Sequence, residues 1–136
     1  MSHLEIYIDG ASKGNPGHSG VGVVIYQNGL RIKDISSYIG TATNNVAEYT
    51  ALIYALEEAL LLKAKSLKIN TDSQLLARQL NKIYKVKHPG IINLYSRATH
   101  LLSGFEKVSV NHIPREENSL ADKLATQAVE STLRKV

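Results

Sequence analysis

The 136-residue sequence contains no cysteine, and it has little that could hold it in a membrane. Without cysteine, disulfide bonds, zinc–thiolate sites and thiol catalysis are excluded, and a reducing cytoplasm is compatible with the composition. The N-terminus carries no apolar signal core, and Glu57 and Glu58 interrupt the longest apolar region, residues 51–62. We therefore expect a cytoplasmic protein with no membrane segment.

Composition indicates one globular unit. A chain with 43% hydrophobic residues can bury a core without metal or disulfide crosslinks, so we expect a single domain over residues 1–136. The formal charge of +4 and the pI near 9.3 favour a polyanionic partner only weakly. Nothing in the composition implies an obligate protein partner, and we expect a monomer.

Hydrophobic periodicity predicts an α/β fold with the element order βββαβααβα and a mixed five-stranded sheet flanked by helices. A first strand, residues 4–10, alternates apolar and polar residues and ends at Asp9-Gly10, before a glycine-rich loop over residues 11–20. Two more antiparallel strands meet at the tight turn Asn28-Gly29. The further expected strands are 20–26, 30–38, 67–70 and 108–110; the expected helices are 45–64, a short one beginning near 74, 91–102 and 119–133; residues 81–90 are expected to form a basic loop.

Four acids stand at the expected ends of strands and beginnings of helices, namely Asp9, Glu48, Asp72 and Asp122. Each has a structural alternative: Asp9 could hold a turn, Glu48 could form a capping box with Asn45, Asp72 could cap the second helix, and Asp122 could pair with Ser119. Four unrelated caps are not expected to converge on one sheet edge. Clustered carboxylates without cysteine suit hard divalent cations such as Mg²⁺, which promote phosphoryl displacement. Taken together, the acids favour a metal site.

Four motifs carry a family resemblance. They are Tyr7-Ile-Asp-Gly-Ala-Ser-Lys-Gly-Asn-Pro-Gly17, Thr43-Asn-Asn-Val-Ala-Glu-Tyr49, Thr71-Asp-Ser-Gln74 and Pro114-Arg-Glu-Glu-Asn-Ser-Leu-Ala-Asp122 with Leu124-Ala125. In this order and over essentially the whole chain they resemble type 1 ribonuclease H. The resemblance is to a compact form that lacks the inserted basic handle and a separate hybrid-binding module.

The resemblance implies a ribonuclease H fold and a metal-dependent endonuclease that cuts the RNA strand of an RNA–DNA hybrid, leaving 5′-phosphate and 3′-hydroxyl ends. It also implies two Mg²⁺ ions per site when substrate is bound, with Mn²⁺ as a possible substitute. The implied metal ligands are Asp9, Glu48, Asp72 and Asp122. The implied contacts to the hybrid are Asn15, Asn44 and Gln74 in the minor groove and Thr43 at a DNA phosphate.

Two departures from bacterial relatives add further expectations. In place of the basic handle, the loop after the second helix carries Lys82, Lys85 and Lys87, which we expect to bind substrate, the alternative being a solvated charge run. His112 lies ten residues before Asp122 but adjoins a strand rather than a glycine-rich loop. We therefore assign the auxiliary catalytic role to Arg115, with His112 as the alternative.

Two other functions are compatible with this fold. A catalytically silent member that binds hybrid or RNA usually lacks one of the four acids, whereas all four are present here. Another nuclease on the same fold, such as a junction resolvase or transposase core, would not carry the motif Asn44-Asn-Val-Ala-Glu48.

Overall fold

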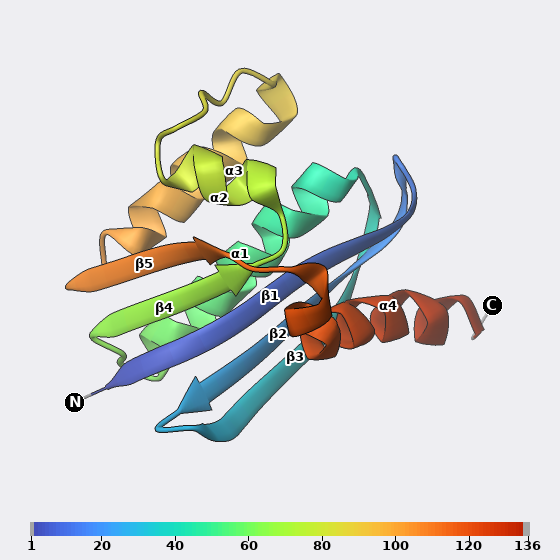
Figure 1. Cartoon of the computed structure of the whole chain (residues 1–136). Helices are drawn as coiled ribbons and strands as arrows, with labels where there is room; N and C mark the ends of the chain where they lie inside the picture. The colour runs from blue at the N-terminus through green and yellow to red at the C-terminus, as the bar shows by residue number, and fades with distance from the viewer. Residues whose placement is uncertain (1, 135–136) are drawn as a thin grey trace.

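The computed structural model describes residues 2–134 and has the predicted order of elements (Figure 1). The strands are β1 (His3–Gly14), β2 (Gly17–Gln27), β3 (Leu30–Ala42), β4 (Ser66–Thr71) and β5 (Lys107–His112). The helices are α1 (Asn44–Leu61), α2 (Gln74–Leu80), α3 (Pro89–Leu102), the 3₁₀ helix η1 (Arg115–Asn118) and α4 (Ser119–Arg134). The strands form one sheet in the order β3-β2-β1-β4-β5, in which β1, β2 and β3 pair antiparallel while β4 and β5 join in parallel. The predicted mixed sheet is confirmed.

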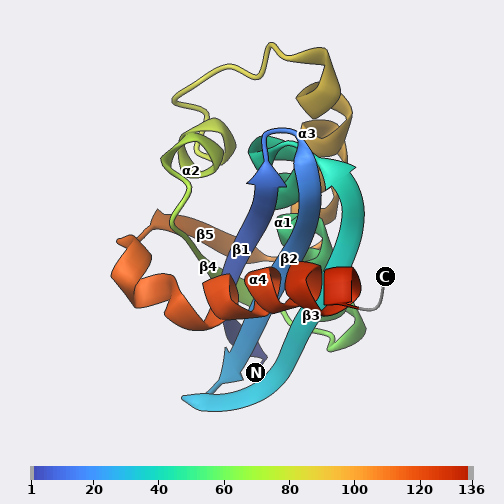
Figure 2. The same ribbon diagram turned by 90° about the vertical axis from the view of Figure 1, so that its right-hand side faces the viewer.

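The sheet has a helical layer on each face (Figure 2). Helix α1 packs on β1 and β2, with α3 beside it, and α4 crosses β1, β2 and β3 on the opposite face. The main core lies between α1 and the sheet because alternate residues of β1, such as Ile6 and Ile8, meet an apolar helix surface that includes Leu52 and Leu56. Each of these four side chains is essentially inaccessible to solvent.

The predicted loop over residues 11–20 is wrong, because β1 and β2 continue to pair as far as Gly14 and Gly17. Ser12 and Ser19 are register partners, their hydroxyl oxygens lie 2.7 Å apart, and the Ser12 hydroxyl also donates to the carbonyl of Ala42 on β3. Polar pairs of this kind extend a sheet without apolar alternation, so periodicity does not detect them.

Two helix boundaries also differ from expectation. Helix α1 ends at Leu61 rather than near residue 64, and α3 begins at Pro89 rather than at Ile91. Proline suits this position because the first turn of a helix needs no donor from its backbone, and the His88 side chain caps it by accepting from Gly90 N at 3.0 Å.

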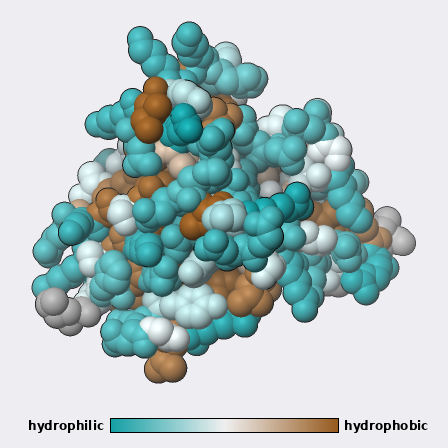
Figure 3. All heavy atoms as spheres, viewed as in Figure 1, coloured by the Kyte–Doolittle hydropathy of each residue, from teal (hydrophilic) through white to brown (hydrophobic). Residues whose placement is uncertain are grey.

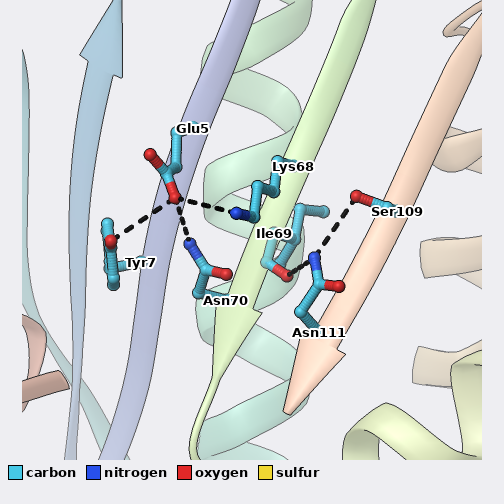
Figure 4. Close-up of polar contacts among 7 residues, drawn as sticks. All are labelled: Glu5, Tyr7, Lys68, Ile69, Asn70, Ser109 and Asn111. Atoms are coloured by element: carbon cyan, nitrogen blue, oxygen red, sulfur yellow. Dashed lines mark hydrogen bonds and ion pairs between the residues drawn. The ribbon is translucent and has the colours of Figure 1, made fainter. Parts of the chain in front are cut away.

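Helix α4 does not extend over β4 and β5, so this part of the sheet faces outward (Figure 1). The uncovered surface is polar: Glu5 accepts a hydrogen bond from Asn70 at 3.0 Å, forms an ion pair with Lys68 at 3.6 Å and meets the Tyr7 hydroxyl at 3.4 Å (Figure 4). Burial and the neighbouring Glu5 carboxylate raise the pKa of Tyr7. On this side of the molecule hydrophilic atoms predominate, and hydrophobic residues appear in small separate groups (Figure 3). None of the helices in residues 2–134 is long and apolar enough to cross a membrane.

Candidate active site

Asp9 lies inside β1 rather than at its end, but at the point where its neighbour β4 stops. The parallel ladder between β1 and β4 finishes at the pair Ile8 and Thr71, and on its other side Asp9 pairs with Gly22 of β2. Asp72 directly follows Thr71. Both carboxylates therefore lie level with the carboxyl end of β4, one on β1 and one directly after β4. Ligands collect at such ends in sheets with parallel strands.

Asp72 does not cap α2, contrary to the alternative considered from sequence. Ser73 is the N-cap, and its hydroxyl accepts from Leu76 N at 3.1 Å. Since the serine satisfies the helix terminus, the Asp72 carboxylate is free to face Asp9.

Glu48 does not form the capping box with Asn45, because Thr43 is the N-cap of α1 and its hydroxyl accepts from Val46 N at 3.2 Å. The Glu48 carboxylate, 7% exposed as a residue, instead accepts a hydrogen bond from the backbone amide of Gly10 on β1. This contact depends on glycine, because a Cβ at position 10 would lie 2.4 Å from the carbonyl carbon of Ala47. The close approach of α1 to β1 thus brings a helix acid to a strand acid.

Asp122 reaches the site from the opposite face of the sheet. It lies in the first turn of α4 and lines the same cleft as Asp9. Gly22, the register partner of Asp9, permits this arrangement, because a Cβ there would lie 2.0 Å from the carbonyl oxygen of Ala121.

The four predicted acids are therefore gathered in one place. Oxygens of Asp9, Glu48 and Asp72 all lie within 4.8 Å of one another, and Asp122 lies beside Asp9 and lines the same cleft. Burial, followed by the charges of Glu48 and Asp72, raises the pKa of Asp9 to about 10, and burial raises the pKa of Glu48 to about 7. Such carboxylates repel one another unless they share protons or cations.

The donor set fits a hard divalent cation. Its carboxylate oxygens are the ligands that Mg²⁺ and Mn²⁺ prefer, and a cation placed among them would relieve the repulsion that raises the pKa values. The cluster opens into a cleft of about 510 Å³, which is bordered by β1, the start of α1, the residues between β4 and α2, η1 and α4. The chemistry of the donors and the open cleft together suit metal-assisted reaction of a large substrate.

Arg115 and His112 are placed as their sequence positions predicted. Arg115 begins η1, lines the cleft and has Nη2 3.9 Å from Oδ1 of Asp122, with 80% of its side chain exposed. His112 ends β5, is exposed and does not line the cleft. Of the two side chains, only that of Arg115 is positioned beside the acids.

The four residues expected to contact the hybrid lie around the cleft. Asn44 lines it, and Oδ1 of Asn15 at the tip of the β1–β2 hairpin accepts from the backbone amide of Asn44 at 3.0 Å. Thr43 is occupied in capping α1, and Gln74 is exposed at the first turn of α2. Asn15, Thr43 and Gln74 do not line the cleft itself.

The basic loop, expected over residues 81–90, covers residues 81–88 because α3 begins at Pro89, and its lysines do not line the cleft of the acids. Lys82 and Lys85 border a separate hollow of about 350 Å³ that also includes Tyr84, and Lys87 is exposed. The loop has internal structure, because the Arg78 guanidinium lies 5.3 Å from the centroid of the Tyr84 ring and the Arg78 carbonyl accepts from Tyr84 N at 3.2 Å. These contacts hold the Tyr84 part of the loop against α2 and leave the three lysine side chains exposed.

Sequence reasoning missed some residues that line the cleft, among them Lys13, Ser73 and Thr126. Lys13 lies in the first motif, but it falls in the region interpreted as a loop. Thr126 follows Asp122 by four residues, and this spacing on a helix could have indicated a shared face.

The comparisons with known proteins agree with this geometry. Residues 7–128 match the family model described as reverse transcriptase-like. Ribonuclease HI of Halobacterium salinarum is 42% identical over 128 residues, which cover 93% of this chain and 64% of that protein, and its crystal structure superposes with a TM-score of 0.93 at 40% identity over 96% of this chain and 99% of that chain. Bifunctional protein Rv2228c of Mycobacterium tuberculosis is 39% identical over 93% of this chain and 35% of that protein.

A second similar structure is LC11-RNase H1, isolated from compost and solved in complex with an RNA/DNA hybrid. It has a TM-score of 0.90 and 39% identity over 96% of this chain and 99% of that chain. The present chain spans about one third and about two thirds of the length of the two curated relatives named above.

Proposed function

The chain belongs to the ribonuclease H family, and on that premise we propose that it is a metal-dependent endonuclease that hydrolyses the RNA strand of RNA–DNA hybrids. The observation that carries the proposal is the group of three carboxylates, Asp9, Glu48 and Asp72, whose oxygens lie within 4.8 Å of one another in an open cleft. We take residues 1–136 as one ribonuclease H domain. Its monomeric state and its cytoplasmic location stay predictions.

In this proposal Asp9, Glu48, Asp72 and Asp122 hold the divalent cations, with two Mg²⁺ ions present when substrate is bound and Mn²⁺ as a substitute. When bound, the cations would activate the attacking water and stabilise the 3′ oxygen that leaves as its bond to phosphorus breaks. The chain's own contribution is to keep four carboxylates in place: Gly10 donates to Glu48 from β1, and α4 places Asp122 in the cleft beside Asp9.

Arg115 is proposed to assist electrostatically. Its long, permanently charged side chain extends from η1 beside Asp122 and can donate paired hydrogen bonds to a phosphate. A guanidinium does not lose its proton near neutral pH, so Arg115 would stabilise charge and would not act as a general base.

The hybrid is proposed to lie across the cleft between the β1–β2 hairpin and α2. Asn15, Asn44 and Gln74 would meet its minor groove, where a 2′-hydroxyl distinguishes RNA from DNA, and Thr43 would meet a DNA phosphate. Lys82, Lys85 and Lys87 would add affinity through the phosphate backbone at a distance from the acids.

One assay tests the proposal. End-labelled RNA–DNA hybrid, double-stranded RNA and double-stranded DNA of one sequence are each incubated with Mg²⁺, Mn²⁺ or excess chelator. We expect cleavage of the hybrid alone, in its RNA strand, with 5′-phosphate and 3′-hydroxyl ends. The matched control is Asp9→Asn, which keeps the shape of the side chain and removes its charge. Cleavage in chelator or by the control variant would overturn the proposal, as would hybrid binding by the wild type without cleavage.

A further inference from the structure

The amide of Asn118 is buried at the junction of η1 and α4, and none of the roles described above uses it. Asn118 is 1% exposed, and its Nδ2 donates a hydrogen bond of 2.8 Å to the backbone carbonyl of Ile8. Asn118 and Ile8 are 110 positions apart in the sequence. Ile8 immediately precedes Asp9 and is the last residue of β1 to pair with β4. This bond therefore anchors the beginning of α4 to the strand at the edge of the acid cluster.

Helix geometry connects Asn118 to Asp122. Asn118 is the last residue of η1 and directly precedes α4, and Asp122 follows it by four positions in the first turn of α4, a spacing that brings side chains to one side of a helical segment. Asn118 contacts Ile8 on β1, and Asp122 lines the cleft beside the next strand residue, Asp9. The residue before α4 and the first turn of α4 thus lie beside two consecutive residues of β1.

Few other polar contacts fix this end of α4. Ala121 and Ala125, between and beyond the two residues, are fully buried and lie against Gly22, which has no side chain with which to restrain them. Small apolar surfaces permit close approach but allow sliding, whereas a hydrogen bond to a strand carbonyl fixes both distance and register. The Asn118 amide therefore fixes the position of α4 along β1, which the contact of Ala121 and Ala125 with Gly22 does not.

If Asn118 only filled space, its polar side chain would be energetically unfavourable. Its Oδ1 is the one buried side-chain polar atom without a hydrogen-bond partner in residues 2–134. A buried acceptor without a partner is unfavourable, and an apolar residue would avoid this cost. The presence of an amide at this position is explained by its Nδ2, which donates to the Ile8 carbonyl.

We propose that Asn118 is a positioning residue that sets the place of Asp122 beside Asp9 through its bond to Ile8. The inference rests on the proposed function, since Asp122 is assigned there to the metal site. Asn118 acts through Asp122 and touches neither metal nor substrate.

The test compares Asn118→Ala with Ser36→Ala. The Ser36 hydroxyl donates to the carbonyl of Leu124 at 2.7 Å, so the control removes a bond of the same kind from the same helix, but on the β3 side. Two measurements are made on each protein: the kinetics on hybrid at saturating Mn²⁺, which give kcat and KM, and the rise in Tm that Mn²⁺ causes without substrate. The second needs no turnover, because a cation that binds the folded state raises Tm by mass action.

For Asn118→Ala we expect kcat to fall by about tenfold or more with KM within about twofold, as for a displaced group in a preorganised site. We also expect the Mn²⁺-induced rise in Tm to shrink by at least about half, since one carboxylate leaves the metal site. Ser36→Ala should match the wild type in both. In an Asp122→Asn background, Asn118→Ala should add almost nothing, because interacting residues are not additive.

Equal effects of the two substitutions would overturn the proposal by showing that any loosening of α4 suffices. An unchanged Tm response in folded Asn118→Ala would overturn it as well. If the alanine variant is unfolded, Asn118→Ser makes the same test. The serine side chain leaves a smaller cavity than alanine, and its hydroxyl is too short to reach the Ile8 carbonyl, so the hydrogen bond is still lost. A wild-type protein that gains Tm with Mn²⁺ but does not cut hybrid would reject the proposed function, and the Tm comparison would still decide the role of Asn118.

Discussion

Replacement of Asp9 by Asn should stabilise the metal-free protein while abolishing turnover. Burial and the charges of Glu48 and Asp72 raise the pKa of Asp9 to about 10, whereas the unfolded chain has the ordinary value of 3.8. The folded state therefore binds more protons than the unfolded state between these values, and the free energy of unfolding falls as pH rises through this range. Asn has the same shape and no charge to lose, so the variant lacks this penalty.

The size of the effect follows from the pKa difference. Between pH 3.8 and pH 7 the wild type loses about 1.4 kcal/mol per pH unit, or about 4 kcal/mol in total. Relaxation of the site and entry of water reduce this value, so we expect Asp9→Asn to gain about 2–4 kcal/mol at pH 7. The gain should vanish near pH 3.5, where the wild-type carboxyl is protonated in both states.

The assay is urea unfolding in chelator at pH 3.5, 5, 7 and 8, followed by circular dichroism, with Asp34→Asn as the control. Asp34 pairs with Arg31 on the surface of β3, and its replacement should leave stability nearly unchanged. Mg²⁺ at pH 8 should narrow the gap between wild type and Asp9→Asn, because it binds the intact cluster. A variant no more stable than the wild type at pH 7 in chelator would refute the reasoning that the acids repel one another.

Three further predictions concern the substrate and the packing of α4. Replacing the three basic-loop lysines by alanine should raise KM for hybrid and flatten its dependence on salt with little change in kcat; an unchanged salt slope would assign these lysines to the solvated surface. Arg115→Ala should lower kcat about tenfold, as expected for the loss of one charged contact in the transition state, and His112→Ala should lower kcat much less. The rates of both variants are measured from pH 6 to 9 at saturating hybrid, and the opposite order would reverse the assignment. Gly22→Ala should destabilise the fold by about 2 kcal/mol or more, measured by thermal unfolding, because its Cβ would meet the Ala121 carbonyl; an unchanged Tm would show that α4 can move away from the sheet at no cost.

Periodicity was a sound guide wherever one face of an element is apolar. The order of strands and helices and the mixed sheet are confirmed because β1 and α1 bury regular apolar faces against each other. It failed where polar pairing takes over, as at Ser12 and Ser19 in the extended hairpin. The caps considered as alternatives to the metal site are absent from α1 and α2, where Thr43 and Ser73 are the N-caps.

The sequence by itself determined which acids to examine, because four carboxylates stood in recognisable settings, and it identified the family through those settings. Only the tertiary structure decided how they meet. Gly10 and Gly22 admit α1 and α4 so closely that a helix acid from each face reaches Asp9, and Asn118 bonds to a carbonyl 110 positions away. Such contacts depend on the spacing between elements that are distant in sequence, and local patterns carry no information about that spacing. The raised pKa of Asp9 has the same origin, since it arises from the burial and convergence of charges and not from any single residue.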